Sequence, residues 1–478
     1  MLSKSKIEMK NITILGAGLG GLTAGALLAK KGHKVTILEQ HTMVGGCATV
    51  FKRKGGFSCE VGLHEMDGVY TNPHIVQIFK ELGVYEAIEF LKAPEFFETH
   101  TQNGSFLMPD GVENAEDVLI EKFPHETKGI ERYFKTIKQI YSSLEKLQNA
   151  SWYHYALFPF LFWDILFYKP KSVSDILNRL INDDELKQLL NSNVGYYNDT
   201  PDSLSFLLHA VAQYSYYSGG GYFIKGGSGN LSEYLAQVVR DNSGEVITKA
   251  NVVRCSKNYV EYTHKKENKQ ITSDIIISNI SPQQSYALYG IEYNETKPLG
   301  DALLSIYLGF SQNLKDVYGK RAYSNFILGE DASEKTLTFV DYSQIDSGLT
   351  KDAHKSFGHI TLIDNIEEWK NLSEQEYKDK KEDILKSALQ RLEKYYPNII
   401  DLVEYTEVGT AKTVERYIKT PNGTAYGFKP TPKEFFRIAK VKSKKVDNLY
   451  FVGQWVIAGG FSPSIVSGLL CCAKVIKR

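Results

Sequence analysis

The apolar positions near the amino terminus fall into two short runs, separated by a glycine-rich turn and a helical stretch. Residues 11–15 and 34–38 are rich in Ile, Val, Leu and Thr, which is typical of buried β-strands. Between them, residues 22–30 carry small side chains on one face of a helical repeat. The order strand, turn, helix and strand predicts a parallel βαβ unit.

The middle of the chain changes from helical to extended patterning and back. From residue 70 to about residue 149, charged and apolar positions interleave with helical spacing, which predicts an inserted, helix-rich part. Strands are expected around residues 246–254, up to residue 277, and again within residues 300–410. Further helices are predicted for residues 184–190, 204–214, 231–240 and 374–396.

The carboxyl end returns to the pattern of the amino end. Residues 448–452 have the composition of a buried strand, and residues 453–460 that of a glycine turn. The chain then passes through Pro463 into a helix that ends at Cys472. We assign this strand, turn and helix to the same domain as the amino-terminal βαβ unit.

The charge balance of this 478-residue chain argues against a polyanion partner. Lys and Arg together number 56, as do Asp and Glu, so the formal net charge is +0 and no basic field exists to bind nucleic acid. The 30 Tyr and 24 Phe residues instead favour a hydrophobic small-molecule ligand, because aromatic side chains line apolar pockets.

The cysteines argue against both disulfides and metal. They are odd in number and contain no C-x-x-C pair, which suits neither a disulfide framework nor a zinc site. We therefore expect no metal and a reducing, cytoplasmic location. The five cysteines are Cys47, Cys59, Cys255, Cys471 and Cys472.

The amino terminus superficially resembles a secretion signal, because Lys4, Lys6 and Lys10 precede the apolar residues 12–29. Five glycines within that stretch suit a strand, turn and helix better than a continuous apolar helix. No window of the sequence reaches the ~20 uninterrupted apolar residues of a membrane-spanning helix.

The turn after the first strand matches the spacing G-x-G-x-x-G of dinucleotide-binding folds. Its glycines permit a tight turn, a close approach of backbone to a pyrophosphate, and close packing of helix on strand. Glu39 ends the second strand, where a carboxylate accepts hydrogen bonds from both ribose hydroxyls and disfavours a 2′-phosphate. The motif glycines are Gly16, Gly18, Gly20 and Gly21.

Two further glycine turns favour FAD over NAD. Gly45 and Gly46 follow the acidic strand end and offer a second close backbone approach, as a long dinucleotide that lies extended through the protein requires. An ordinary β-turn is the alternative for this pair. The turn from Gly453 to Gly460, followed by a helix, aims backbone N–H groups at a ribityl phosphate or a negatively charged ring edge.

With these motifs the chain resembles the flavin-dependent amine oxidase superfamily, and more closely its branch of phytoene desaturases, carotenoid isomerases and retinol saturases. The matching motifs occur in the same order over nearly the whole chain, and they are specific to the branch but not to one reaction. They are residues 16–21, Glu39, and residues 44–51, 55–64, 222–228, 420–427 and 450–468.

The resemblance implies a non-covalent FAD. Its ADP half is then held by the glycines named above and by Glu39, while the backbone of Val252 or Val253 touches the adenine. The ribityl chain and the flavin ring are then met by Gly453, Gln454, Ser464 and Ile465.

His64 and Glu65 follow a segment that runs beside the flavin ring in such proteins. A histidine there can deliver or remove a proton near neutral pH, so His64 is our first candidate catalytic residue and Glu65 the second. A structural histidine is the alternative. Cys47 stands where amine oxidases usually carry arginine, which disfavours an amine oxidase, and we interpret its thiol as a small buried side chain rather than a catalytic one.

Residues 152–168 are almost wholly apolar or aromatic, and Lys169 and Lys171 follow them. A helix of ~17 residues measures ~25 Å, short of a ~30 Å hydrocarbon core, and Pro159 interrupts it, so we expect no span. Two alternatives stay open. One is a peripheral membrane contact at the mouth of a lipid tunnel, and the other is a buried lobe or a subunit contact.

We therefore predict an α/β fold in two lobes. A discontinuous, Rossmann-like FAD-binding domain of the glutathione reductase type is expected from residues 1–70, 222–300 and 411–478. An inserted α+β substrate-binding domain is expected from residues 71–221 and 301–410.

The expected activity is desaturation, saturation or isomerisation at a C=C or CH–CH unit of an isoprenoid or polyene, such as a carotenoid or a retinoid. The sequence does not separate these three reactions and gives no signal for an oligomeric state. Two rivals are a flavin amine or amino-acid oxidase and a non-catalytic prenyl-lipid carrier of the same fold. The intact Glu39 and glycine set argue against the carrier.

Overall fold

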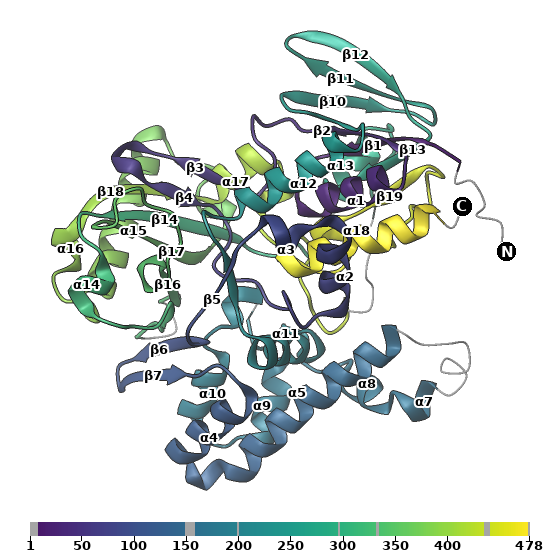
Figure 1. The fold of residues 1–478 in the computed structure, drawn as a ribbon. Helices are drawn as coiled ribbons and strands as arrows, with labels where there is room; N and C mark the ends of the chain where they lie inside the picture. The colour runs from purple at the N-terminus through teal and green to yellow at the C-terminus, as the bar shows by residue number, and fades with distance from the viewer. Residues whose placement is uncertain are drawn as a thin grey trace.

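The computed structural model describes residues 8–148, 158–197, 200–294, 297–330, 334–434 and 440–476. The predicted βαβ unit is present: β1 (Asn11–Leu15) and β2 (Lys34–Leu38) are parallel, with Asn11 opposite Lys34, and α1 (Leu19–Lys30) connects them. Every residue of α1 from Leu19 to Ala29 is buried, because this helix lies between the sheet and the helices α12 (Gly229–Asp241) and α18 (Phe461–Ile476). Figure 1 shows this packing.

Three separate stretches of chain build the first sheet. β13 (Ile275–Ser278) pairs in parallel with β1, β19 (Leu449–Phe451) pairs in parallel with β13, and β9 (Glu245–Ile247) pairs in parallel with β2. The strand order is β19-β13-β1-β2-β9. The carboxyl-terminal strand therefore joins the amino-terminal unit, as the sequence predicts, and the α/β class is confirmed.

An antiparallel sheet of three strands extends from the same lobe. β10 (Ala250–Cys255) pairs with β11 (Tyr259–His264), and β11 pairs with β12 (Glu267–Thr272). Figure 1 shows it at the top of the molecule, beyond β2. Strands in this part of the chain are predicted from the sequence, and the structure adds their antiparallel pairing.

A second large sheet has seven strands and carries the inserted lobe. Its order is β18-β14-β17-β16-β15-β6-β7, and the long strands β14 and β17 pair antiparallel along nine positions, from Ala302 opposite Asp364 to Phe310 opposite Ser356. The strands are β6 (Phe97–Thr101), β7 (Gly104–Met108), β14 (Ala302–Phe310), β15 (Ser324–Ile327), β16 (Leu337–Asp341), β17 (Ser356–Asp364) and β18 (Val403–Gly409).

Strands β6 and β7 correct the expectation that residues 70–149 are helical. They form an antiparallel hairpin, and β6 pairs in parallel with β15, which lies far later in the chain. The partner strand is what makes this segment extended, and a local helical pattern cannot reveal it. A third strand of this stretch, β5 (Phe90–Lys92), pairs with β8 (Tyr222–Ile224).

Helices cover one face of the seven-stranded sheet. α15 (Glu374–Glu393) begins at a capping box in which Ser373 and Glu376 bind each other's backbone N–H groups, and its apolar side packs in one hydrophobic cluster with β14, β16 and β17. The predicted helix at 374–396 is thereby confirmed. The same face carries α14 (Leu314–Tyr318), α16 (Ile399–Leu402) and α17 (Ala411–Ile418).

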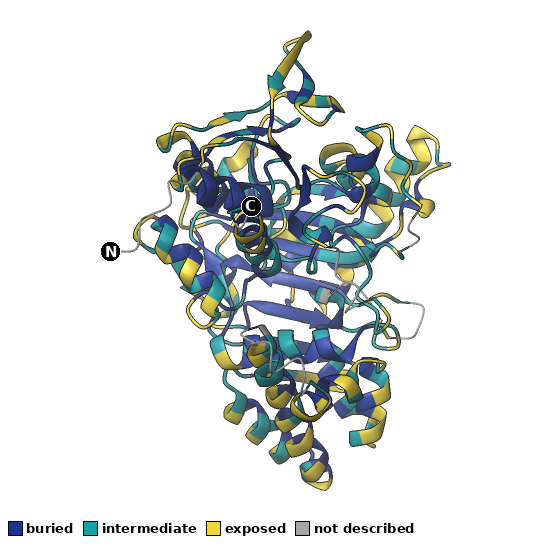
Figure 2. Cartoon of the chain, turned by 90° about the vertical axis from the view of Figure 1, so that its right-hand side faces the viewer, coloured by how far each residue is buried: buried dark blue, intermediate teal, exposed yellow. Residues whose placement is uncertain are grey.

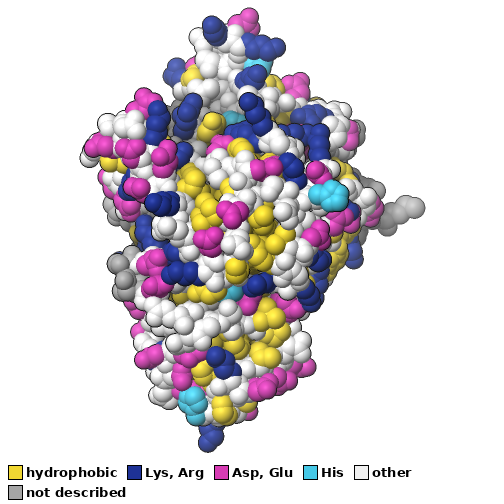
Figure 3. Space-filling view, turned by 90° about the vertical axis from the view of Figure 1, so that its left-hand side faces the viewer, with side chains coloured by type: hydrophobic (Ala, Val, Ile, Leu, Met, Phe, Trp, Pro, Cys, Tyr) yellow, Lys and Arg dark blue, Asp and Glu magenta, His cyan; other side chains and the backbone are white. Residues whose placement is uncertain are grey.

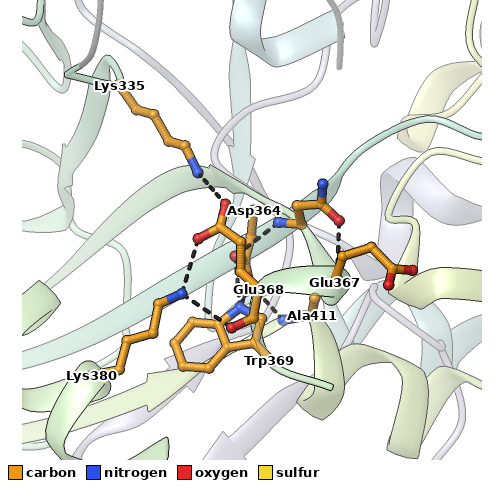
Figure 4. A network of polar contacts seen from close by, with 8 residues as sticks. Lys335, Asp364, Glu367, Glu368, Trp369, Lys380 and Ala411 are labelled. Carbon is orange, nitrogen blue, oxygen red and sulfur yellow. Dashed lines mark hydrogen bonds and ion pairs between the residues drawn. The ribbon is translucent and has the colours of Figure 1, made fainter. Parts of the chain in front are cut away.

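The buried carboxylate of Asp364, at the end of β17, forms hydrogen bonds to the start of α17 and to the turn that follows β17, as Figure 4 shows. Asp364 accepts hydrogen bonds from the Trp369 indole N–H, at 2.8 and 3.0 Å, and from the backbone N–H of Ala411 at 2.8 Å. Outside this pair, Glu368 forms ion pairs with Lys335 and Lys380. Asp364 therefore links the turn after β17 to the start of α17.

A helical cluster lies at the opposite end of the molecule from the three-stranded sheet (Figure 1). Its core joins the long α5 to α4, α9, α10 and α11, and Figure 2 shows that the helices of this end turn exposed faces outward. Its members are α4 (Val112–Lys122), α5 (Thr127–Gln148), α7 (Phe158–Leu161), α8 (Trp163–Tyr168), α9 (Val173–Leu180), α10 (Asp184–Asn191) and α11 (Phe206–Gly219).

Helix α2, which directly follows residue 70, packs with the first lobe rather than with the insertion. The buried Ile75, Ile78 and Phe79 of α2 (Pro73–Leu82) belong to the same hydrophobic cluster as α1 and α18. The proposed division at residue 71 stays a prediction, and this packing favours a later boundary. The remaining elements are α3 (Val84–Ala87), α13 (Pro282–Ala287), β3 (Val50–Lys52) and β4 (Ser58–Glu60).

Among the described residues no helix is both long and apolar enough to cross a bilayer. In the same residues no group of three or more His, Cys, Asp or Glu side chains is arranged to hold a metal ion. All five cysteines are free thiols. The face seen in Figure 3 mixes positive and negative side chains and gathers hydrophobic ones near its middle.

Candidate functional site

A cavity of about 1360 Å³ opens at the carboxyl ends of the parallel strands and continues into the inserted lobe. This is the edge of a parallel sheet at which ligands generally bind. A pocket for one small ligand usually measures about 300–1,000 Å³, so this space suits a large ligand together with a second one. Residues from both lobes line it, among them Gly16, Glu39 and Gly453 on one side and Leu208 and Tyr307 on the other.

The turn between β1 and α1 brings backbone directly to the cavity. Gly16 has a φ of +90°, which disfavours any residue with a Cβ, and a Cβ on Gly20 would lie 2.5 Å from the backbone nitrogen of Gly453. The helix begins at Gly18, which offers no capping side chain, and its first turn holds no acidic residue. The positive end of α1 therefore faces the cavity and suits a phosphate.

Gly16, Gly18 and Gly20 line the cavity, whereas Gly21 does not. A Cβ on Gly21 would lie 2.5 Å from the carbonyl oxygen of Gly16, so this glycine permits the close packing of helix on turn. Its role is thus in the fold of the turn rather than in contact with a ligand.

Asn279 is a site residue that sequence reasoning missed. It directly follows β13, lines the cavity, and accepts a hydrogen bond from the backbone N–H of Gly21 at 3.2 Å. Its side chain lies against Gly18 and Gly453, because a Cβ on either glycine would be 2.4 Å from it. A polar residue at the carboxyl end of a buried parallel strand was the available signal.

Glu39 follows β2 directly and has 8% of its surface exposed. Its Oε2 accepts from the backbone N–H of Ala17 at 2.7 Å, and its Oε1 accepts from that of His41 at 2.8 Å. Each carboxylate oxygen can accept more than one hydrogen bond, so both retain capacity toward the cavity. The residue fits the recognition of two vicinal hydroxyl groups of a ribose.

Gly45 and Gly46 lie beside the first turn. Gly45 forms a parallel bridge with Gly18 and donates its N–H to the carbonyl of Ala17 at 2.7 Å. Both glycines have positive φ and line the cavity. Two turns that are separate in the sequence, the one after β1 and the one at Gly45 and Gly46, thus lie side by side and form one wall of backbone.

The two residues predicted as alternatives for contacting the adenine, Val252 and Val253, differ in position in the structure. Val252 lines the cavity beside Ala250 and Asn251, whereas Val253 does not line it and has 47% of its surface exposed. A β-bulge between Val252 and Arg254 accounts for this difference in direction. Of the two alternatives, the structure places only Val252 at the cavity.

The carboxyl-terminal turn closes the same wall. Gly453 has a φ of +81°, and its N–H donates to Ser467 Oγ at 2.7 Å. Gln454 and Ser464 also line the cavity. The Ile465 side chain is fully buried in the core that packs α1 against α18 and does not line the cavity, so its contact with the flavin stays a prediction.

These turns fit an adenine dinucleotide. They supply the N-terminus of α1 for a diphosphate, a buried carboxylate with spare acceptor capacity, and a wall of glycine backbone at Gly16, Gly18, Gly45, Gly46 and Gly453. The continuous length of this wall suits FAD better than a mononucleotide.

His64 lines the cavity, but one of its ring nitrogens is already in contact with residues of the protein. Its Nε2 lies 3.0 Å from Nδ1 of His359 and 3.2 Å from Oγ1 of Thr361, both on β17. Burial lowers the pKa of His64 to about 4, so the ring is neutral at physiological pH. Tyr307 stacks on His359 at 4.9 Å and completes the cluster.

Glu65 has the opposite character. Its side chain lines the cavity with 8% exposed, and neither carboxyl oxygen has a hydrogen-bond partner among the described residues. Burial, and to a smaller extent the charges of Asp110 and Asp67, raise the pKa of Glu65 to about 8. At neutral pH the carboxyl keeps its proton, and its two oxygens are shielded, with Oε2 against Gly221.

Cys47 also lines the cavity. Burial raises the pKa of its thiol to about 11, so the sulfur is not a thiolate at neutral pH. This environment supports its interpretation as a small packing side chain.

The aromatic run at 152–168 is described only from residue 158 onward, and Trp152 and Tyr153 lie outside the described residues. Phe160 and Trp163 have 83% and 62% of their surface exposed, whereas Phe162 is buried with 2% exposed. The described part is therefore divided between the core and an outward aromatic face. Helix α8 packs on α5, whose Leu144 and Leu147 line the cavity.

Comparison with known proteins gives the chain a family and a fold. The family described as flavin containing amine oxidoreductase matches residues 19–476. A cyclohexylamine oxidase from Brevibacterium oxydans superposes with a TM-score of 0.65 at 15% identity, over 98% of this chain and 99% of that one. At this identity the likeness shows the fold.

Two curated relatives match over nearly the whole chain. An all-trans-retinol 13,14-reductase of Danio rerio is 24% identical, over 98% of this chain and 86% of its own length. A chloroplastic prolycopene isomerase of Daucus carota is 27% identical, over 97% of this chain and 79% of its own length.

Proposed function

The chain belongs to the flavin-containing amine oxidoreductase family, and we propose that it acts on a carbon–carbon bond of a long isoprenoid or polyene, such as a carotenoid or a retinoid. It is an FAD-dependent oxidoreductase. One observation carries the proposal of substrate: besides the dinucleotide turns, the cavity is lined by apolar side chains of α5, α11 and β14, which we call its apolar arm. That arm is lined by Leu144, Leu147, Leu208, Val211, Leu303 and Tyr307.

The names of the two relatives support this choice. Retinol and prolycopene are both conjugated polyenes, and the two proteins are named for a reduction and an isomerisation of such molecules. Desaturation, saturation and isomerisation place the same demand on the site, which is to hold a chain without polar handles against the flavin. We propose this substrate class and leave the direction of the reaction to the experiment below.

FAD, when bound, supplies the carrier of the hydride that leaves or reaches a substrate carbon. The protein's own part begins with holding this group. The N-terminus of α1 would meet its phosphates, and Glu39 would offer acceptors to its ribose. The residues that would hold FAD are Gly16, Gly18, Gly20, Glu39, Gly45, Gly46, Val252, Asn279, Gly453, Gln454 and Ser464.

Glu65 is the residue we propose as the proton carrier. It lies on the cavity, has a free carboxyl and keeps its proton at neutral pH. A carboxylic acid with a pKa near the working pH can both give a proton to a substrate carbon and take one back. The C–H and C=C units of a polyene carry no polar group that could serve as acid or base, so the protein must supply it.

We propose that His64 positions rather than transfers a proton, which reverses the order expected from sequence. Its Nε2 is occupied by His359 and Thr361, and its pKa of about 4 keeps the ring uncharged at neutral pH, so it is not an imidazolium acid. The sequence could not reveal this, because both partners lie on β17, far along the chain.

The apolar arm has a chemical role beside binding. Its aliphatic and aromatic walls exclude water, so a proton held by Glu65 is not exchanged with a dissolved base during turnover. Tight walls also keep an extended substrate in one position relative to the flavin.

We further propose that the exposed aromatic face of α7 and α8 collects substrate at a membrane surface. Phe160 and Trp163 are exposed, Lys169 and Lys171 follow, and α8 packs on the helix whose Leu144 and Leu147 reach the cavity. Aromatic side chains beside cations are typical of interfacial contacts. A cytoplasmic location with peripheral attachment to a membrane fits this role.

Sedimentation with anionic liposomes tests the membrane contact. Phe160→Ser with Trp163→Ser should lose most liposome binding while flavin absorbance is kept, since each transferred aromatic contributes about 1.5–3 kcal/mol. Leu107→Ser with Val317→Ser is the matched control, because these residues are also exposed, at 43% and 41%, but belong to other elements. Equal sedimentation of both double variants would refute the contact.

A substrate panel tests the proposed reaction. The purified flavoprotein is mixed with retinoids and carotenoids in liposomes, with oxidised and with reduced flavin, and the products are separated by chromatography and mass. We expect a polyene product that differs by two hydrogens or by geometry alone. Hydrogen peroxide formed from amines, with every polyene unchanged, would instead identify an amine oxidase.

A further inference from the structure

The segment that carries His64 and Glu65 to the cavity forms neither helix nor strand. Buried backbone without a regular partner must find hydrogen bonds elsewhere, because an unpaired N–H or C=O group is costly. Two backbone N–H groups of this segment find their acceptor in Glu60, whose Oε1 accepts from Gly62 at 3.2 Å and from Leu63 at 3.0 Å. Glu60 in turn is fixed by Ser228.

On the carbonyl side the same need is met by three tyrosines. The Leu63 carbonyl accepts from the Tyr342 hydroxyl at 2.8 Å, and the His64 carbonyl accepts from the Tyr323 hydroxyl at 2.7 Å. The third consecutive carbonyl, that of Glu65, accepts from the Tyr216 hydroxyl at 3.2 Å.

All three tyrosines come from the inserted lobe, on separate pieces of chain. Tyr323 directly precedes β15, Tyr342 directly follows β16, and Tyr216 lies on α11. The segment they hold belongs to the other lobe, between β4 and α2. Three hydroxyls on three elements therefore fix one short stretch across the lobe boundary.

The rings of these tyrosines are themselves held in place. Tyr323 and Tyr342 are buried, at 0% and 1% exposed, and meet edge to face with centroids 5.7 Å apart. Tyr216 stacks on Phe96 at 5.3 Å. Such packed rings cannot turn toward other acceptors, so the hydroxyl directions are fixed by the core. Burial also raises the pKa of Tyr323 and Tyr342 well above the ordinary value, which keeps both hydroxyls as donors.

We propose that Tyr342, Tyr323 and Tyr216 are positioning residues, by which the inserted lobe sets where the backbone of residues 63–65, and with it the Glu65 side chain, lies at the edge of the cavity. The catalytic consequence rests on the proposed function. Tyr323 and Tyr342 do not line the cavity, so they act on a substrate only through the segment they hold. Tyr216 does line it, on the same helix as Leu208, and its hydroxyl reaches the Glu65 backbone.

The first test separates position from binding. Tyr323→Phe, Tyr342→Phe and their double variant remove the hydroxyls and keep the rings. Tyr234→Phe is the matched control, because its hydroxyl also donates to backbone carbonyls, those of Leu82 and Gly83 at 2.9 and 2.8 Å, away from the cavity. All variants should keep FAD absorbance.

For the double variant we expect kcat to fall by about 10- to 100-fold with KM changed less than about twofold, since a misplaced group costs rate rather than affinity. The control should keep the wild-type kcat. A kcat of the double variant equal to that of Tyr234→Phe would overturn the proposal, and so would a rise in KM with kcat unchanged. If the double variant fails to fold, the two single variants decide by the same criteria.

The second test needs no substrate. The infrared band of the protonated Glu65 carboxyl, assigned by its loss in Glu65→Gln, is followed against pH. In the wild type it should disappear near pH 8, following the pKa of about 8. Without the clamp the segment loosens toward water, so the band should disappear at a lower pH in the double variant but not in Tyr234→Phe. The charged and titratable groups around Glu65 are Asp67 of its own segment, Asp110 after β7, Lys92 of β5, which pairs with Asp110, and the hydroxyls of Tyr323 and Tyr216.

The two tests distinguish the possible failures. A shifted band in the double variant, in a protein that converts no polyene, would support the clamp and refute the proposed function. Conversion of a polyene by the wild type, with neither kcat nor band altered in the double variant, would refute the clamp and leave the proposed function in place.

Discussion

Glu39 and Glu65 lie on the same cavity and are equally buried, each with 8% of its surface exposed, yet their surroundings differ in kind. Glu39 accepts hydrogen bonds from the backbone N–H groups of Ala17 and His41. Glu65 accepts none from the described residues and lies near the like charges of Asp67 and Asp110. Glu39 is thus held by backbone donors in a position to accept from a ligand, whereas Glu65 has no donor to offset the burial that raises its pKa.

The largest expected effect follows from removing the proton of Glu65. Glu65→Gln keeps the size and polarity of the side chain but cannot transfer a proton, so turnover of a polyene should fall by about 10²- to 10⁴-fold. Flavin absorbance should stay as in the wild type. Asp67→Asn, a change of the neighbouring carboxylate, should reduce turnover much less. Steady-state rates decide, and full activity of Glu65→Gln would remove this residue from the mechanism.

The next effect concerns stability against pH. In the folded protein the pKa of Glu65 is raised from 4.5 to about 8, so its contribution is complete below about pH 4.5 and is lost as pH rises toward 8. At about 1.4 kcal/mol per pKa unit the loss approaches 4–5 kcal/mol as an upper bound. The melting temperature of Glu65→Gln relative to the wild type should therefore rise from pH 4 to pH 8 and then level off. A constant difference across this range would contradict the assignment.

A change at Glu39 should have the opposite effect to a change at Glu65: it should weaken FAD binding and leave turnover at saturating FAD unchanged. Glu39→Ala removes an acceptor from two ribose hydroxyls and should weaken FAD binding by about 1–3 kcal/mol. Titration of the apoprotein with FAD measures this loss, and at saturating FAD the turnover should recover. Affinity equal to that of the wild type would show that Glu39 serves only the fold of its turn.

The smallest effect is expected at Cys47, which shares the cavity with both carboxyls. Its thiol has a pKa of about 11 and is not a nucleophile at neutral pH. Cys47→Ala should change turnover by no more than about twofold, within the usual range for a small packing change. A loss comparable with that of Glu65→Gln would make the thiol a catalytic group.

The same contrast explains how much the sequence could predict. The site around Glu39 is local: a strand, a glycine turn and an acidic strand end lie within one βαβ unit, so their spacing predicts their chemistry. The site around Glu65 is not local. His359, Tyr323 and Tyr342 reach it from the inserted lobe, and nothing in the spacing of these residues places them beside residues 63–65. For the same reason the sequence ranks His64 above Glu65, since hydrogen-bond partners and burial, not residue type, set the two pKa values.

The fold divides in the same way. Parallel strands with their own glycine turns are predicted correctly, whereas β6 and β7 are missed because their partner β15 lies far later in the chain. Ile465 and Val253 show the limit at single residues: a helix face and a β-bulge turn their side chains away from the cavity.

The central claim is that an FAD-dependent site with a protonated Glu65 converts a polyene. Its most direct test compares wild type and Glu65→Gln, both loaded with FAD to the same absorbance, in anaerobic mixing with one retinoid or carotenoid in liposomes, once with oxidised and once with chemically reduced flavin. The claim predicts a saturated, desaturated or isomerised product from the wild type and a rate at least about 100-fold lower from Glu65→Gln. Equal rates from both proteins, or no polyene product from a wild type that oxidises amines, would contradict it.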